Sequence, residues 1–123
     1  MNKKILIPAI LFIAVVLVAV IMIVKDNGGG PKSESSIILY YGDGCPHCAI
    51  VDEFIKENKV EEKVSYEKKE VFNNKENADE LTGRAKACGL PTDSIGVPFL
   101  WDGSQCLIGD VDIINFFKQK IGQ

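Results

Sequence analysis

Residues 37 to 48 read IILYYGDGCPHC. The first five are apolar and favour β structure without alternating, which is the pattern of a central strand covered on both faces. Gly42-Asp43-Gly44 ends this strand, and a helix is predicted from about Cys45 to Asn58, with Pro46 at its first position. The predicted buried stripe of this helix is Ile50, Val51, Phe54 and Ile55. The segment therefore predicts a buried strand that leads into a helix with two cysteines in its first turn.

Cys45 and Cys48 stand three residues apart at the start of the predicted helix, a spacing that permits a short disulfide. Cys45 would occupy the N-cap region, where free backbone N–H groups and the positive helix end favour a thiolate. Its pKa is therefore expected to fall below the usual value of about 8.5. His47 would add a donor or a cation to that thiolate, which would make the disulfide a better oxidant. Cys48, one turn further, is expected to be more buried and to act as the resolving thiol.

Two other uses of this cysteine pair are a zinc site and a plain structural disulfide. Zinc would need two more ligands, and the remaining cysteines, Cys88 and Cys106, are not closely spaced. A static disulfide would not need Pro46 and His47 between its cysteines. The sequence thus favours dithiol–disulfide exchange, with no metal, nucleotide or flavin cofactor.

The rest of the domain is predicted to form strand, helix, hairpin and helix. Residues 64–72 have β character, and their charged middle suggests a strand near an edge. A helix face follows at Ala78, Leu81, Ala85 and Cys88, and this helix stops at Gly89. Phe99-Leu100-Trp101 and residues 104–108 flank Asp102-Gly103, a strong hairpin signal.

The last helix is predicted to be capped by Asp110 and to bury Val111, Ile114, Phe117 and Ile121. A hairpin after a β-α-β unit adds two antiparallel strands to the same sheet. The predicted fold is therefore α/β, a four-stranded mixed sheet with helices on both faces.

A membrane anchor is predicted before this domain. Residues 5–24 contain no charged side chain, and as a helix they would span roughly 30 Å, the thickness of a bilayer core. The organisation expected is a cytoplasmic tail at 1–4, a transmembrane anchor at 5–24, a flexible Gly- and Ser-rich tether at 25–36 and the α/β domain at 37–123. A cleaved signal peptide is the alternative to a retained anchor.

The charges that flank the anchor predict its orientation. Lys3 and Lys4 precede it, whereas Lys25 and Lys32 on the other side are diluted by acidic residues, so the N-terminus is expected in the cytoplasm and the domain outside the cytoplasmic membrane. An inverted or cytosolic domain is the alternative. Beyond residue 32 ten basic residues face sixteen acidic ones, a balance that disfavours nucleic acid and anionic lipid surfaces as partners.

The CPHC motif after a buried strand, together with Gly96-Val97-Pro98 before the hairpin, resembles the thioredoxin superfamily. The Pro-His pair is similar to that of DsbA-type disulfide oxidants and of the thioredoxin-like domains associated with vitamin K epoxide reductase homologues. The resemblance covers residues 36–123 and implies a glutaredoxin-sized fold. It also implies that Pro98 is a cis-proline facing the cysteines, and that the backbone of Val97 pairs with an extended substrate strand.

Two positions depart from the family pattern. Thioredoxins and DsbA-type oxidants have a buried carboxylate at the position of Leu39. In having an apolar residue there, this chain is similar to glutaredoxins. Residues 109–112 weakly resemble the glutaredoxin segment that holds glutathione, but Asp43 stands where a basic residue would assist. Because an acidic side chain repels the glutathione carboxylates, glutathione is not expected as a substrate.

The second cysteine pair, Cys88 and Cys106, admits two interpretations. Outside the cytosol unpaired thiols are unusual, which favours a structural disulfide between them. The epoxide reductase-associated domain also has an extra cysteine near the position of Cys88. The alternative is two separately buried, small apolar side chains.

Protein thiols and disulfides are the expected substrates, with a membrane or extracytoplasmic redox partner that exchanges electrons with the domain. The direction of electron flow stays open, because the Pro-His pair suits an oxidant or isomerase and a membrane tether suits a reductase. The rival function is a non-catalytic interaction or assembly module in which the Cys45–Cys48 disulfide is purely structural.

Overall fold

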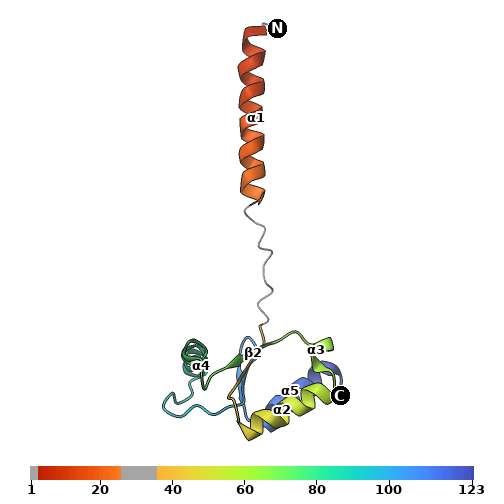
Figure 1. Ribbon diagram of the computed structural model, residues 1–123, viewed down its shortest axis with the longest axis vertical. Coiled ribbons are helices and arrows are strands. Elements are labelled where there is room, and N and C mark those ends of the chain that lie inside the picture. Colours follow the sequence, from red (N-terminus) through yellow and green to blue (C-terminus); the bar gives the residue numbers. More distant parts are fainter. Residues whose placement is uncertain (1–2, 26–35) are drawn as a thin grey trace. The chain divides into compact units, whose positions relative to one another are not determined.

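The computed structural model describes residues 3–25 and 36–123 (Figure 1). The chain divides into two compact units, Met1–Glu34 and Ser35–Gln123. The second unit contains all four cysteines and is the domain predicted from the CPHC segment. The tether predicted at 25–36 lies almost entirely outside the described residues, as do the first two residues of the predicted tail.

The first unit contains helix α1, Lys3–Lys25, which covers the predicted anchor. Side chains of this helix are described for Lys4 and for residues 7–19. Within the described parts of the chain, no helix is both long enough and apolar enough to cross a membrane. The large apolar side chains that α1 leaves exposed are Ile7, Ile10, Leu11, Phe12, Ile13, Val15, Val16, Leu17 and Val18.

The second unit is built on one mixed sheet with the strand order β2-β1-β3-β4. Its strands are β1 (Ile38–Tyr41), β2 (Glu67–Glu70), β3 (Phe99–Trp101) and β4 (Cys106–Ile108). Strand β1 is central, parallel to β2 and antiparallel to β3, and β4 completes the hairpin with β3. The charged strand β2 is at an edge, as its composition predicts.

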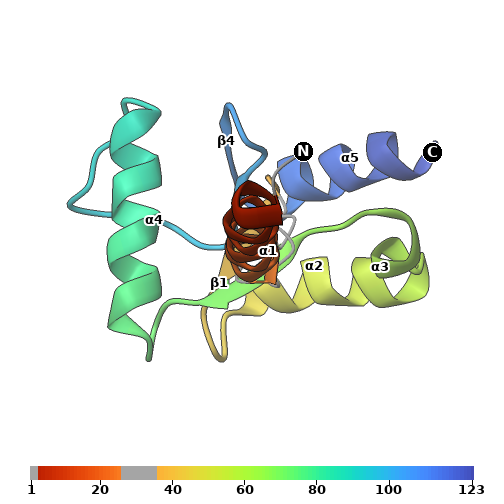
Figure 2. The same cartoon turned by 90° about the horizontal axis from the view of Figure 1, so that it is seen from above.

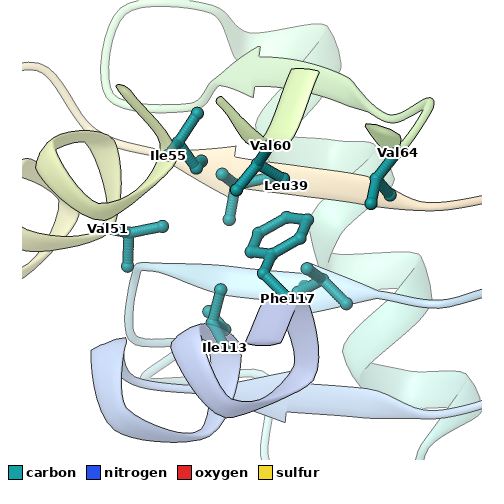
Figure 3. Close-up of a cluster of buried hydrophobic side chains, with 8 residues drawn as sticks. Leu39, Val51, Ile55, Val60, Val64, Ile113 and Phe117 are labelled. Atoms are coloured by element: carbon teal, nitrogen blue, oxygen red, sulfur yellow. The ribbon is translucent and has the colours of Figure 1, made fainter. Parts of the chain in front are cut away.

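Helices cover both faces of the sheet (Figure 2). On one face α2 (Pro46–Glu57), α3 (Val60–Lys63) and α5 (Asp110–Ile121) enclose a core around Phe117, shown in Figure 3. On the other face α4 (Lys75–Ala87) packs Leu81 and Ala85 against Tyr40 and Phe99. The prediction of a four-stranded mixed sheet with helices on both faces is confirmed.

The hairpin between β3 and β4 is organised by Asp102. Its Oδ1 accepts the backbone N–H groups of Ser104 and Gln105, each at 2.8 Å. Local bonds of this kind let an Asp side chain replace a backbone turn interaction. The Asp102-Gly103 pair thus marks the turn that the sequence predicts.

The buried face of α5 differs from the predicted one. Ile113 and Phe117 are fully buried, whereas Val111 is 66% exposed. Residues four apart share a helix face, and this pair lies on the face that α5 turns toward the sheet. The predicted cap is also wrong, because Gly109 is the N-cap and Asp110 is the first residue inside the helix.

Helix α2 shows a smaller difference in register. Its buried residues are Cys48, Val51 and Ile55, and Ile50 is 44% exposed. The spacing of three and four residues begins at Cys48, because the resolving cysteine is itself part of the buried face. The predicted stripe is therefore confirmed for Val51, Phe54 and Ile55, and it is wrong only in including Ile50 and leaving out Cys48.

Candidate redox-active site

The turn between β1 and α2 presents Cys45 at the end of the central strand. Gly44 has a φ of +76°, in a region that residues with a Cβ rarely adopt, and it reverses the chain after Asp43. The N–H of Cys45 donates to the carbonyl of Gly42 at 3.1 Å and closes the turn. Pro46 follows as the first helical residue, a position whose N–H would have no intrahelical partner. The local sequence therefore places Cys45 at the N-cap of α2, as predicted.

Cys45 and Cys48 form a disulfide with their Cα atoms 5.2 Å apart. The Sγ of Cys45, which is half-buried, accepts the backbone N–H of Cys48 at 3.2 Å. Cys48 is only 4% exposed. The more exposed Cys45 and the more buried Cys48 are as predicted. The N–H donor and the helix terminus would both stabilise a thiolate on Cys45.

Val97 and Pro98 lie against this disulfide, although they are far away in the sequence. The carbonyl oxygen of Val97 is 3.7 Å from Cys45 Sγ, and the Val97–Pro98 peptide bond is cis. The carbonyl of Pro98 accepts the N–H of Gly109 at 2.9 Å, which joins this loop to the start of α5. The structure thus brings together Cys45, Cys48, Val97 and Pro98, the group that the sequence and the family resemblance assembled.

His47 has a different partner from the predicted one. Its Nδ1 lies 3.2 Å from Oδ1 of Asp110, and within the described domain the ring makes no hydrogen bond to Cys45. The His47 side chain is 67% exposed and that of Asp110 is 22% exposed. Sequence reasoning missed this pair because it assigned Asp110 to a helix cap. No local sequence signal identifies the pair, because the two residues are 63 positions apart and meet only through the packing of α5 beside α2.

Glu70, at the end of β2, fastens the loop that carries Cys45. Its carboxylate accepts backbone N–H groups from Asp43 at 3.2 Å, Phe72 at 2.7 Å and Asn73 at 2.9 Å. Partial desolvation alone would raise the pKa of Glu70, but these backbone donors outweigh it and lower the pKa below its ordinary value. This residue was not singled out from the sequence, although β1 and β2 are parallel and end at the same edge of the sheet.

Phe72 lies over the same loop. A Cβ added at Gly42 would overlap the Phe72 ring, so the glycine permits the ring to rest directly on the backbone. The ring is nevertheless 60% exposed. A cavity of about 240 Å³ opens next to the disulfide, lined by Tyr41, Gly42, Asp43, Gly44, Cys45, Pro46, Cys48, Ala49 and Asp52. A larger hollow of about 610 Å³ adjoins residues 61–66 and Lys68 and does not include the cysteines.

Cys88 and Cys106 form the second disulfide, with their Cα atoms 6.2 Å apart. Cys88 is the C-cap of α4 and Cys106 begins β4, so the bond joins that helix to the hairpin. Both side chains are half-buried. The structure therefore confirms the disulfide and not the alternative of two separately buried cysteines.

The arrangement around Cys45 can support nucleophilic attack on, or by, a sulfur atom. One sulfur is accessible and has a backbone donor, the second is enclosed directly behind it, and a backbone carbonyl lies beside the first. These are the requirements of thiol–disulfide exchange through a mixed disulfide.

The chain resembles known proteins at the level of solved structures. No family model matches the chain, and no curated protein matches it. Among solved structures, the chain is similar to a point mutant of the thioredoxin-like protein BC3987, with 28% sequence identity and a TM-score of 0.47. The match covers 69% of this chain and 97% of the other.

Proposed function

We propose that this chain is a thiol–disulfide oxidoreductase of the thioredoxin superfamily that exchanges disulfides with proteins through Cys45 and Cys48. The observation that carries the proposal is the asymmetry of the two sulfurs. Cys45 is accessible at a helix N-cap and accepts the Cys48 N–H, whereas Cys48 is buried behind it. A disulfide that served only to hold the chain together would gain nothing from this placement.

The exchange proceeds in two steps when the domain acts as an oxidant. A substrate thiolate attacks Cys45 Sγ, the Cys45–Cys48 bond breaks, and Cys48 leaves as a thiolate. A second substrate thiolate then attacks the substrate sulfur of the mixed disulfide and displaces Cys45. The substrate loses two electrons and forms its disulfide, while the domain becomes a dithiol. With a substrate disulfide the steps run in reverse, and Cys48 resolves the intermediate.

The substrate segment that we propose is an extended stretch of protein beside Val97. The carbonyl oxygen of Val97 is 3.7 Å from Cys45 Sγ. A substrate strand that paired with the Val97 backbone would therefore bring the substrate's sulfur close to Cys45. Positioning of this kind converts a bimolecular reaction into one between neighbouring groups. The substrate class is therefore protein thiols and disulfides rather than glutathione.

We further propose that α1 anchors the protein in the cytoplasmic membrane with the domain outside. In support, residues 5–24 contain no charged side chain, and the described part of α1 exposes large apolar side chains. Apolar surface of this extent needs a partner of low polarity. Lys3 and Lys4 favour a cytoplasmic N-terminus. A membrane or extracytoplasmic redox partner would then exchange electrons with the domain.

The test of the proposed exchange uses two single variants of the full chain. Cys48→Ser is expected to accumulate mixed disulfides with substrate proteins, because Cys45 can attack but nothing resolves the intermediate. Cys45→Ser is expected to trap none and to lose exchange activity. Non-reducing gels of the two variants measure this difference. Cys88→Ser/Cys106→Ser, which removes the other disulfide, is the control and should keep exchange.

The rival function is an interaction module with an inert Cys45–Cys48 disulfide. It predicts slow alkylation of Cys45 below neutral pH after reduction, whereas a catalytic thiolate is alkylated rapidly. Trapping by Cys45→Ser and not by Cys48→Ser would contradict the assigned roles. Slow alkylation together with no trapping by either variant would favour the interaction module.

A further inference from the structure

The ring of His47 has an acidic partner on another helix. Nδ1 of His47, in the first turn of α2, is 3.2 Å from Oδ1 of Asp110, in the first turn of α5. The two residues are 63 positions apart in the sequence. Their approach depends on the packing of α5 beside α2 and on the N–H of Gly109, which donates to Pro98 next to the redox centre.

Asp110 is the more firmly placed member of this pair. Its side chain is 22% exposed, compared with 67% for that of His47. As the first residue of α5 it also benefits from the positive end of that helix. It makes no capping bond of its own, because Gly109 is the N-cap and α5 has no side-chain cap. The carboxylate is therefore available to hold the imidazole.

We propose that Asp110 is a positioning residue that holds His47 away from Cys45 and so limits how far the imidazole stabilises the Cys45 thiolate. This inference rests on the proposed exchange function. In the disulfide form the sulfur carries no charge, and the histidine ring pairs with the Asp110 carboxylate. Reduction creates a thiolate on Cys45, which competes with Asp110 for the same ring. Asp110 thus favours the disulfide and lowers the reduction potential that the Cys-Pro-His-Cys motif would otherwise have.

Other acidic groups lie on the elements that adjoin the start of α2. From the loop before α2 and from α2 itself these are Asp43 and Asp52, from β2 Glu70, and from α5 Asp112. Glu70 is engaged by backbone N–H groups and Asp52 by Lys68. Asp112 is exposed in the same first turn as Asp110 and has no side-chain bond in the described domain. It therefore provides a matched control with the same charge.

The experiment equilibrates the full chain, in detergent micelles, with mixtures of reduced and oxidised dithiothreitol from pH 5 to pH 8. The dithiol supplies the two electrons and becomes its cyclic disulfide, and alkylation with mass spectrometry counts the reduced Cys45–Cys48 pair. Asp110→Asn keeps the size of the side chain and removes its charge. It is expected to shift the equilibrium toward the reduced form by about three-fold to ten-fold, which is about 15 to 30 mV.

This shift should depend on pH, because only a protonated imidazole carries a positive charge that can pair with the thiolate. Asp112→Asn should give a clearly smaller shift that depends little on pH. In a His47→Ala chain, Asp110→Asn should shift the equilibrium no more than Asp112→Asn does. Circular dichroism and an intact Cys88–Cys106 disulfide verify that each variant is folded.

Equal shifts for the two Asn variants would overturn the inference, since Asp110 would then act only as a charge. A full effect of Asp110→Asn without His47 would overturn it as well. A shift toward the disulfide form would show that Asp110 supports the thiolate rather than opposing it. These readouts use a small dithiol, so they are independent of trapping of protein substrates, which tests the proposed function.

Discussion

Glu70 links the loop before α2, residues 42–45, to the loop after β2, residues 71–74, beside the Cys45–Cys48 disulfide. Backbone N–H donors from both loops lower the pKa of its carboxyl group despite partial desolvation. A group whose pKa is lower in the folded state stabilises the fold above its unfolded value of about 4.3, and this contribution is lost as the pH falls through the folded value. Protonation of Glu70 should therefore loosen the Cys45 loop only in acid.

Glu70→Gln is expected to unfold at a lower urea concentration than the unmodified chain near pH 7. The difference should shrink as the pH falls below about 4, because Glu70 itself is then protonated. Urea unfolding curves of both chains between pH 2.5 and pH 7 measure this difference in the midpoint of unfolding. Glu53→Gln, at an exposed position of α2, should show little difference at any pH. A constant difference for Glu70→Gln down to pH 2.5 would mean that its charge does not matter.

At the same scale, the sequence predicted the reacting sulfurs better than their surroundings. Cys45 and Cys48 are set by a local pattern, a strand followed by a turn and a helix start. Helix periodicity predicts that Cys48 is more buried than Cys45, and the structure confirms this difference. The pairing of His47 with Asp110 could not be predicted, because it depends on how α5 lies beside α2. Contacts between helices that are far apart in the sequence depend on tertiary packing, which cannot be derived from the local pattern of one sequence.

Among the helices, α4 has an N-terminal cap whose contribution to stability can be tested. Asn74 is its N-cap, and the side chain accepts the N–H of Asn77 at 3.0 Å. Asn74→Ala should lower the free energy of unfolding by about 1 kcal/mol, the usual cost of losing such a cap. Urea unfolding measures this change. Asn73→Ala, one residue earlier, is the control, since its bond to Glu70 uses only the backbone. Similar losses for both variants would contradict the capping role.

Helices and strands were predicted well where their pattern was uniform. The segments predicted at 37–41 and 99–101 are strands β1 and β3 with nearly the same bounds, because both are short apolar runs. Helix α3 was missed, and the strand predicted at 64–72 is only Glu67–Glu70. Val60 and Val64, four apart, are both buried against α5, so tertiary packing selected a helical turn there.

At the scale of the whole chain, the proposed anchor can be tested against the domain alone. The full chain should remain with membranes after alkaline carbonate washing, whereas residues 36–123 should be released. A double substitution Leu11→Lys/Val15→Lys should weaken retention, because a lysine at the centre of a membrane helix costs about 2.5–3.5 kcal/mol. Substitution of the same positions by Ala is the control. Release of the full chain by carbonate would contradict anchoring.

The disulfide between Cys88 and Cys106 also encloses a segment of the chain. With the backbone between them it makes a covalent macrocycle, and Val97 and Pro98 lie within that ring. A protease that nicked the backbone there would leave both ends attached, and the pieces would separate only after reduction. In the chain-entropy account, a disulfide that closes a loop of similar size lowers the conformational entropy of the unfolded chain, and it thereby stabilises the folded state by about 3 kcal/mol. The segment that faces Cys45 is thus held by a covalent bond separate from the Cys45–Cys48 bond, which the proposed exchange would open and close.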